Sequence, residues 1–261
     1  MQKLPAIVLA GERGNTGSTL DSSPTVITEI LGITMVERVI NTLSSCNQVD
    51  KICMVGPDPE TASRSESIAR IVGRNNVSYI EPTQNPIKSA ELAFETTGTP
   101  TLITTADHPL LTNSIIKTFL QQGYANGSDF IVGLVPQKYV ERRYPKNRRT
   151  VLRFKDAKLC GSNLFLLKTE KCADVLKLWT KIEKNRKTPW RVVNYFGFNH
   201  LLKYKLGQLR SEEAFEVLSE KTGCSVGFVP IRDARAAIDV DCQQDLSLVT
   251  AILKADEKSD L

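Results

Sequence analysis

PAIVLAGERG, residues 5–14, joins an unbroken apolar run to the beginning of a glycine-rich segment. An apolar run without polar alternation is typical of a strand that is buried on both faces of a parallel sheet. The stretch GERGNTGSTLDSSP (11–24) is too polar for a buried core and has the composition of a loop. We therefore expect the chain to begin with a buried strand that carries a glycine-rich loop at the carboxyl edge of a sheet.

Strand and helix patterns alternate through the first half of the chain. Further strand patterns lie at 51–56, 77–80, 102–107 and 129–135. Helical patterns lie at 35–43, 60–72, 88–96 and 113–122, and Ser89 is a candidate N-cap near the start of the third. This alternation predicts a doubly wound, mostly parallel α/β sheet, in which ligands bind at the carboxyl ends of the strands.

The second half has a different composition. A basic stretch spans residues 142–153, and strand patterns follow at 161–168 and 225–231. Helices are predicted at 170–185, 191–206 and 211–221, and a turn near residue 240 leads into a final helix that reaches about residue 253. Because there is no internal repeat or low-complexity linker, we expect one domain over residues 1–256, with a frayed tail at 257–261.

Composition excludes several classes of protein. The chain has 261 residues, 41% hydrophobic and 24% charged, which is ordinary for a globular protein. Its net charge of +5 is too small and too dispersed to indicate a nucleic-acid partner. No apolar run approaches the roughly 18 residues of a membrane span, and the N-terminus lacks a signal-peptide pattern. The six cysteines form no CxxC pair and are expected to be free thiols in a reducing cytoplasm.

Acidic residues are predicted at two ends of extended segments. LITTADHPL (102–110) places Asp107 at the same sheet edge as the glycine-rich loop, and AAIDVDCQQDL (236–246) offers Asp239 and Asp241, two residues apart on an extended segment. Mg²⁺ takes oxygen ligands, commonly one or two carboxylates plus substrate phosphates. Each aspartate alone fits a cap or turn, and Asp245 is a candidate cap of the final helix. The pair of segments together favours a metal site.

The histidines and the basic stretch leave alternatives open. His108 either supports a metal ligand or fills the turn after the fourth strand, whereas His200, inside an apolar helical pattern, is expected in the core. The basic stretch is either a solvated face or an anion site that includes Arg148 and Arg149.

Five stretches together resemble the nucleotidyltransferases with a MobA-like NTP transferase domain, which include molybdenum-cofactor and sugar-phosphate nucleotidyltransferases. PAIVLAG with its glycine-rich loop resembles the family's nucleotide loop, and GITMVERVINTL (32–43) resembles the helix after it. TADHPLLT (105–112) and IDVDCQQDL (238–246) resemble the two aspartate motifs that bind metal. CGSNLFLL (160–167) resembles the strand that lines the acceptor site.

The resemblance implies a Rossmann-like three-layer α/β/α sandwich of the nucleotide-diphospho-sugar transferase type. It implies transfer of a nucleoside monophosphate from an NTP to a small phosphorylated acceptor, with release of pyrophosphate. Residues 1–135 would be the nucleotide-binding half and residues 136–256 the acceptor-binding half. The partners would be these two substrates and no nucleic acid; whether the protein forms a homodimer stays open.

The resemblance also implies roles for individual residues. Asp107 and Asp241 would bind Mg²⁺ or Mn²⁺, and Arg13 would contact the β- and γ-phosphates, so that Arg13 and Asp107 would be the catalytic residues. The nucleotide would lie against Ala10, Gly11, Glu12, Arg13, Gly14 and Ser89. The acceptor would lie against Arg148, Arg149 and Asn163.

The chain departs from the family's pattern in the nucleotide loop. Glu12 stands where the family usually has glycine, and Thr25 falls near the position of a phosphate-binding lysine, within a stretch (21–32) that has no Lys or Arg. Losing that cation would cost transition-state stabilisation unless Arg13 or the basic stretch replaces it. The alternative is a nucleotide- or phosphometabolite-binding relative that has lost catalysis. A glycosyltransferase that uses an NDP-sugar is disfavoured, because no DxD triplet follows the fourth strand.

Overall fold

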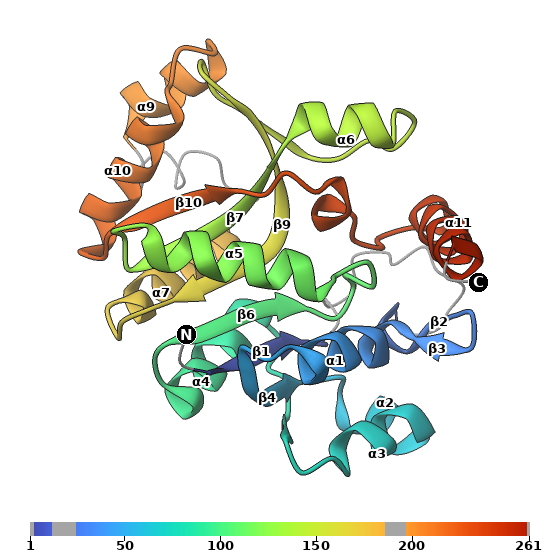
Figure 1. The fold of residues 1–261 in the computed structure, drawn as a ribbon. Helices are drawn as coiled ribbons and strands as arrows, with labels where there is room; N and C mark the ends of the chain where they lie inside the picture. The colour runs from blue at the N-terminus through green and yellow to red at the C-terminus, as the bar shows by residue number, and fades with distance from the viewer. Residues whose placement is uncertain (1–2, 12–24, 186–196, 260–261) are drawn as a thin grey trace.

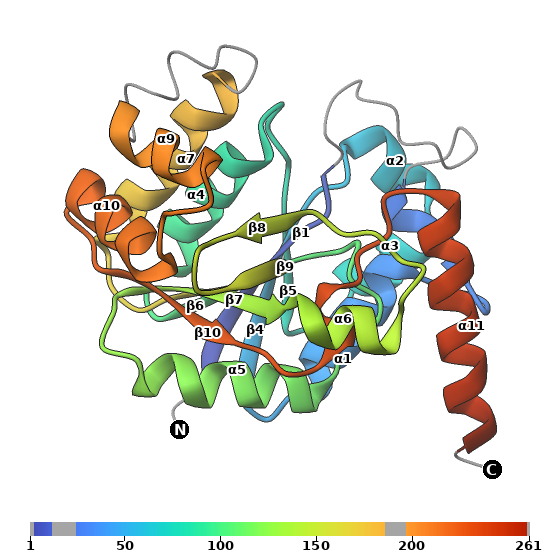
Figure 2. The same ribbon diagram turned by 90° about the horizontal axis from the view of Figure 1, so that it is seen from above.

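A mixed eight-stranded sheet forms the centre of the protein in a computed structural model that describes residues 3–11, 25–185 and 197–259 (Figures 1 and 2). The strand order is β10-β7-β9-β6-β1-β4-β5, and β8 pairs with β9. All pairs in this order are parallel except those that β9 makes. The predicted mostly parallel sheet is therefore confirmed. Its strands are β1 (Leu4–Leu9), β4 (Val49–Val55), β5 (Val77–Ile80), β6 (Thr101–Thr105), β7 (Phe130–Pro136), β8 (Val151–Arg153), β9 (Lys158–Leu167) and β10 (Val226–Pro230).

Helices cover both faces of the sheet, which gives the expected three layers (Figure 2). The first strand shows why. Ala6 and Val8 belong to the apolar cluster beneath α1 and α5, whereas Ile7 belongs to the cluster beneath α4 and α7. Side chains alternate between the two faces of a strand. A strand that is apolar at every position therefore needs helices on both faces of the sheet. The helices on the first face are α1 (Met35–Ser45), α3 (Glu66–Val72) and α5 (Asn113–Ala125), and those on the second are α4 (Pro86–Thr97), α7 (Cys172–Asn185) and α10 (Ser211–Thr222).

Shorter elements and the last helix lie at the margins of these layers (Figures 1 and 2). They are the hairpin of β2 (Glu29–Ile30) and β3 (Ile33–Thr34), the 3₁₀ turns η1 (Thr25–Ile27) and η2 (Ala234–Ala237), and helices α2 (Pro59–Arg64), α6 (Gln137–Arg143), α9 (Phe198–Lys205) and α11 (Gln243–Ser259). Within the described part of the chain, no helix is long and apolar enough to cross a membrane. The six cysteines are free thiols, as predicted.

Two helix boundaries differ from the sequence-based prediction. The single helix expected over 60–72 is two helices, because Ser65 ends α2 through its N–H and begins α3 by accepting a hydrogen bond from Ile68 N. The N-cap of α4 is Asn85, whose Oδ1 accepts from the N–H groups of Ile87 and Lys88, at 2.9 and 3.2 Å. Ser89 is thus wrong as the cap. An Asn directly before Pro at the first helical position was the available signal.

The second half contains the main topological surprise. The strand predicted at 161–168 is β9, and it lies antiparallel between β7 and β6. The chain leaves β7 through α6 and returns through the β8–β9 hairpin. Strand β9 starts opposite the end of β7, where Leu159 pairs with Pro136, and therefore runs back antiparallel to it. The helix predicted at 191–206 is described only as α9, since residues 186–196 lie outside the described part. Helix α11 continues to Ser259, through most of the expected tail.

Two glycines on the neighbouring strands β7 and β9 provide a matched test of packing. A Cβ on Gly133 would lie 2.5 Å from Ser162 Oγ and 2.9 Å from Ile231 Cδ1, whereas one on Gly161 would meet nothing within 4 Å. We expect Gly133→Ala to lower the free energy of unfolding by about 2 kcal/mol through overpacking, and Gly161→Ala to change it by less than about 0.5 kcal/mol. Urea unfolding followed by circular dichroism measures both, and equal effects would contradict this account of the sheet.

Candidate active site

The ends of four parallel strands meet at one edge of the sheet. Ala10 N donates to Val55 O at 2.8 Å, Gly56 N to Ile80 O at 2.9 Å, and Ala106 N to Leu9 O at 2.9 Å. These bonds continue the ladder past the last residues of β1, β4, β5 and β6. The backbones that follow the strands are therefore held close together, as expected for the ligand-binding edge of a doubly wound sheet.

Gly11 and Gly56 allow the first two of these backbones to touch. Gly56 has φ of +88°, and a Cβ there would lie 2.7 Å from Gly11 N. Only glycine adopts that backbone at so small a separation. Ala10 and Gly11 thus stand at the entrance of the glycine-rich loop, as predicted. Glu12, Arg13 and Gly14 lie outside the described residues.

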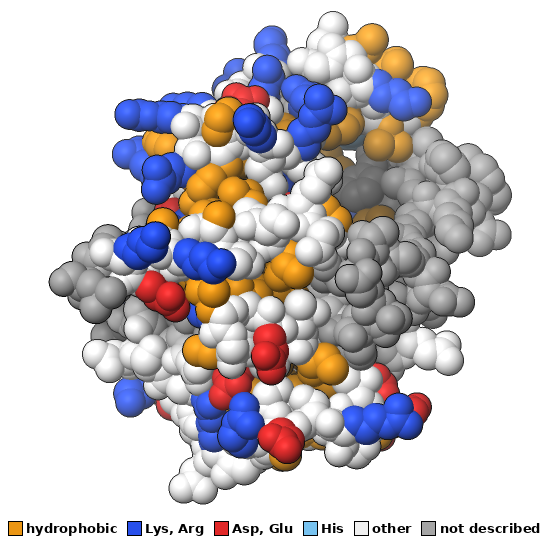
Figure 3. All heavy atoms as spheres, turned by 90° about the vertical axis from the view of Figure 1, so that its right-hand side faces the viewer, with side chains coloured by type: hydrophobic (Ala, Val, Ile, Leu, Met, Phe, Trp, Pro, Cys, Tyr) orange, Lys and Arg blue, Asp and Glu red, His pale blue; other side chains and the backbone are white. Residues whose placement is uncertain are grey.

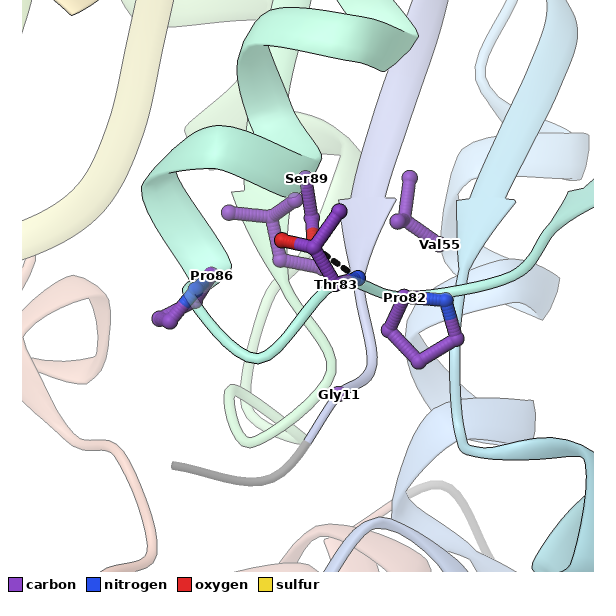
Figure 4. Close-up of a pocket in the computed structure, with 7 residues that line it drawn as sticks. Gly11, Val55, Pro82, Thr83, Pro86 and Ser89 are labelled. Carbon is purple, nitrogen blue, oxygen red and sulfur yellow. Dashed lines mark hydrogen bonds between the residues drawn. The ribbon is translucent and has the colours of Figure 1, made fainter. Parts of the chain in front are cut away.

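A small hollow opens beside Gly11, between β1 and the start of α4 (Figure 4). Its volume is about 210 Å³, including space open to solvent. Ser89 is 3% exposed, and its Oγ accepts a 2.8 Å hydrogen bond from Thr83 N, which fixes the turn that forms one wall. The structure therefore places Ser89 at the predicted nucleotide side of the edge. The lining residues are Leu9, Gly11, Val55, Pro82, Thr83, Pro86 and Ser89.

Sequence reasoning missed most of this wall. Pro82, Thr83 and Pro86 come from the segment EPTQNPIKS (81–89), which directly follows β5. Two prolines in six residues after a predicted strand were the available signal, because proline restrains a loop without needing a backbone hydrogen bond.

Asp107 lies on the other side of the same edge, after β6. Thr105 Oγ1 donates a hydrogen bond to Asp107 Oδ1, and the backbone carbonyl of Asp107 accepts one from Val240 N at 2.9 Å. The second bond brings the segment that carries Asp239 and Asp241 beside Asp107. The two predicted acidic motifs are therefore neighbours in the fold.

This arrangement fits a divalent cation that is completed by its substrate. Asp107 is half-buried and Asp241 is exposed at the surface of the edge. Among the described residues, no three Asp, Glu, His or Cys side chains gather as a full set of metal ligands. One or two carboxylates with phosphate oxygens is the usual donor set of Mg²⁺, so Asp107 and Asp241 are suitable ligands for Mg²⁺ or Mn²⁺ bound together with a nucleotide.

Arg149 has a different environment from the one expected of an acceptor-binding residue. Its guanidinium donates to Asp239 Oδ1, to Asp239 O at 2.8 Å and to Asp245 Oδ1 at 2.9 Å, and its side chain is only 9% exposed. Asn163 Nδ2 donates to the other Asp239 oxygen at 3.3 Å. Arg149 and Asn163 therefore bind the C-terminal acidic segment. Arg148 is exposed.

The basic stretch contains both exposed cations and the buried Arg149. Figure 3 views the molecule from the side toward which the parallel strands run in Figure 1, and Lys and Arg side chains gather in its upper part, where Figure 1 places α6. Arg142, Arg143, Lys146 and Arg148 are exposed. The solvated face and the anion site both remain available to these four residues, whereas Arg149 is engaged inside the protein.

The two histidines also have distinct positions. His108 is 1% exposed with its Nε2 3.2 Å from Arg235 O, so it fills the turn and contacts η2. Burial lowers the pKa of His108, opposed by the Arg235 carbonyl, and favours the neutral ring. The expectation of a core position for His200 is wrong: its side chain is 37% exposed and its Nε2 lies 3.8 Å from Glu213 Oε1.

A doubly wound sheet with a small hollow and two acidic segments at the carboxyl edge of its strands is typical of α/β proteins that bind a ligand at that edge. Residues 6–191 match the MobA-like NTP transferase domain family, so the chain belongs to this family. No curated protein matches the chain.

Several solved structures share the fold. A hypothetical transferase from Thermus thermophilus is 24% identical, with a TM-score of 0.77 over 94% of this chain and 100% of that one. The 4-diphosphocytidyl-2C-methyl-D-erythritol synthase of Anaerococcus prevotii is 12% identical, with a TM-score of 0.59 over 97% and 96%. A CMP:2-keto-3-deoxy-manno-octonic acid synthetase, solved with CTP, is 12% identical, with a TM-score of 0.60 over 98% and 100%. The Rossmann-like nucleotide-diphospho-sugar transferase fold is thus confirmed.

The contact between Gly11 and Gly56 can be tested against a glycine of similar φ. Gly98 has φ of +72° and open space around its Cβ position. We expect Gly56→Ala to lower the free energy of unfolding by about 2 kcal/mol more than Gly98→Ala, because it adds a clash with backbone to the positive-φ strain that both share. Thermal unfolding measures the difference, and equal losses would mean that the two loops are not in close contact.

Proposed function

We propose that the protein is a Mg²⁺-dependent nucleotidyltransferase that transfers a nucleoside monophosphate from an NTP to a small phosphorylated acceptor. The observation that carries this proposal is the Val240–Asp107 hydrogen bond, which joins the two acidic segments at the edge that also holds the hollow. The family of the chain supports the reaction class. Phosphoryl transfer depends on alignment and charge neutralisation more than on covalent chemistry, and these residues are suited to both.

Each part of the site has a role in that reaction. The base would lie against the hollow beside Ser89, and the triphosphate would pass Ala10 and Gly11 toward the glycine-rich loop, where Arg13 would meet the β- and γ-phosphates. A phosphate oxygen of the acceptor attacks the α-phosphorus, and pyrophosphate leaves. The cation, when bound by Asp107 and Asp241, neutralises developing charge on the phosphates.

We propose a pyrimidine nucleotide, with CTP the first candidate. Two prolines and a buried Ser89 form the wall of the hollow against which the base would lie. Two of the solved structures with this fold carry cytidylyl names. Exposed Arg148 is the candidate contact for the acceptor phosphate, since Arg149 is already bound to two aspartates.

The direct test is pyrophosphate release from CTP, UTP, ATP and GTP with a panel of phosphorylated sugars and polyols. We expect Asp107→Asn to reduce the turnover of the best pair at least 100-fold, because the cation loses a charged ligand. Asp50→Asn, at the exposed start of β4 on the opposite edge, is the control and should keep full activity. Undiminished turnover in Asp107→Asn would overturn the metal assignment.

The second candidate function is nucleotide or phosphometabolite binding without catalysis, favoured by the missing lysine near Thr25. Thr25 begins η1 and is half-buried. Calorimetric binding of CTP with no pyrophosphate release across the acceptor panel would favour this candidate.

Restoring a cation tests how much the lysine matters. We expect Thr25→Lys to raise turnover about tenfold or more, because a cation near the phosphates stabilises transition-state charge. Glu29→Lys, at an exposed position of β2, makes a larger change in charge in the same stretch and should have a smaller effect. Steady-state kinetics with CTP compares the two variants; no gain in Thr25→Lys would show that another group already supplies the charge.

A further inference from the structure

The exposed Asp241 lies between two residues that one buried arginine binds. Arg149 contacts Asp239 through a side-chain oxygen and the backbone carbonyl, and Asp245 through Oδ1. The stretch from Asp239 to Asp245 therefore has both of its ends fixed to the same guanidinium. A planar fork of five N–H donors is suited to three acceptors at fixed angles, whereas the single ammonium of lysine is not.

Asp245 transmits this restraint to Asp241 itself. Its Oδ2 accepts from Asp241 N at 3.2 Å and lies 3.2 Å from the thiol of Cys242, while its Oδ1 accepts from Asn147 Nδ2 at 3.1 Å. The Asp245 side chain is 9% exposed. The backbone of Asp241 is thus held from one side by Asp245, and from the other by the Val240–Asp107 hydrogen bond.

Burial makes the Arg149 guanidinium indispensable to its partners. Both Arg149 and Asp245 have side chains that are only 9% exposed, and Asp239 is 28% exposed. Removing the cation would leave two carboxylates close together in a poorly solvated region, which is strongly unfavourable. They would separate or draw in water, and the segment between them would lose its fixed position.

We propose that Arg149 is a positioning residue that holds Asp241 opposite Asp107 and so sets the affinity of the site for its divalent cation. The inference rests on the metal site of the proposed function. It differs from the role expected for Arg149 from the sequence, which was contact with the acceptor. Supporting residues around metal ligands commonly change metal affinity by 10- to 100-fold when they are substituted.

The test measures metal binding apart from catalysis. Mn²⁺ alone is titrated against the protein into the millimolar range, and the free ion is read by electron paramagnetic resonance. We expect Arg149→Lys and Asp245→Asn each to weaken Mn²⁺ binding about tenfold or more. In an Asp241→Asn background, Arg149→Lys should cause no further loss, because the ligand that it positions is already gone.

Arg235→Met is the matched control. Arg235 makes a bidentate ion pair with Asp256, near the other end of α11, at 2.7 and 2.9 Å. It should leave Mn²⁺ affinity unchanged. Circular dichroism at the titration temperature confirms that each variant is folded; the Asp245→Asn result carries the test if Arg149→Lys does not fold.

The outcomes separate the inference from the proposed function. Mn²⁺ affinity that is lost in Asp241→Asn but kept in Arg149→Lys and Asp245→Asn overturns the positioning role alone. An Mn²⁺ affinity that is unchanged in Asp241→Asn overturns both the proposed metal site and the inference about Arg149. A raised KM for the acceptor in Arg149→Lys, with unchanged Mn²⁺ affinity, would mean that Arg149 binds the acceptor and does not position Asp241. Pyrophosphate release, measured separately, tests only the reaction.

Discussion

The hydrogen bond from Val240 N to Asp107 O is the contact on which the candidate site depends. It joins the end of β6, in the first half of the chain, to the segment before α11, in the second. Without it, Asp107 would be a single carboxylate after a strand, bound to Thr105, and Asp241 a single carboxylate before a helix. A divalent cation has little affinity for either alone. The bond is made by backbone groups, so it does not depend on which side chains the two segments carry.

The sequence predicted the sheet well because the central strands are apolar at nearly every position and must be buried on both faces. Apolar runs such as PAIVLA and ICMV (52–55) require burial on both faces, and the helical patterns between them favour parallel pairing. It could not predict the orientation of β9, since an antiparallel strand buried on both faces has the same apolar pattern as a parallel one. It also could not divide the helix expected over 60–72, because Ser65 is unremarkable until its hydroxyl is seen to accept from Ile68 N.

For the candidate site, the sequence indicated which residues lie at the edge of the sheet better than it indicated which groups their side chains contact. Asp107, Gly11 and Ser89 lie at the predicted edge, because each follows or faces the end of a strand. Arg149 and Asn163 were expected at the acceptor and instead bind Asp239. Nothing in a run of arginines distinguishes one that faces solvent from one that enters the protein. The distinction comes from the β8–β9 hairpin, which brings residues 147–149 against the C-terminal segment, and this is tertiary information.

The burial of Arg149 between two aspartates affects how much positive charge the candidate site can offer to phosphates. Positive charge is abundant in residues 142–153, but the one arginine that is most buried is neutralised by two aspartates, so it adds little net field at the phosphates. The remaining cations of the stretch are exposed and screened by solvent. In the proposed reaction, the positive charge that a triphosphate requires would then come from the divalent cation and from the nucleotide loop. Where a lysine helps to neutralise the phosphates, the position of the cation matters less. This chain lacks that lysine, so a fixed position of Asp241 has a larger effect, which gives a physical reason for the buried Arg149 guanidinium beside the second acidic motif.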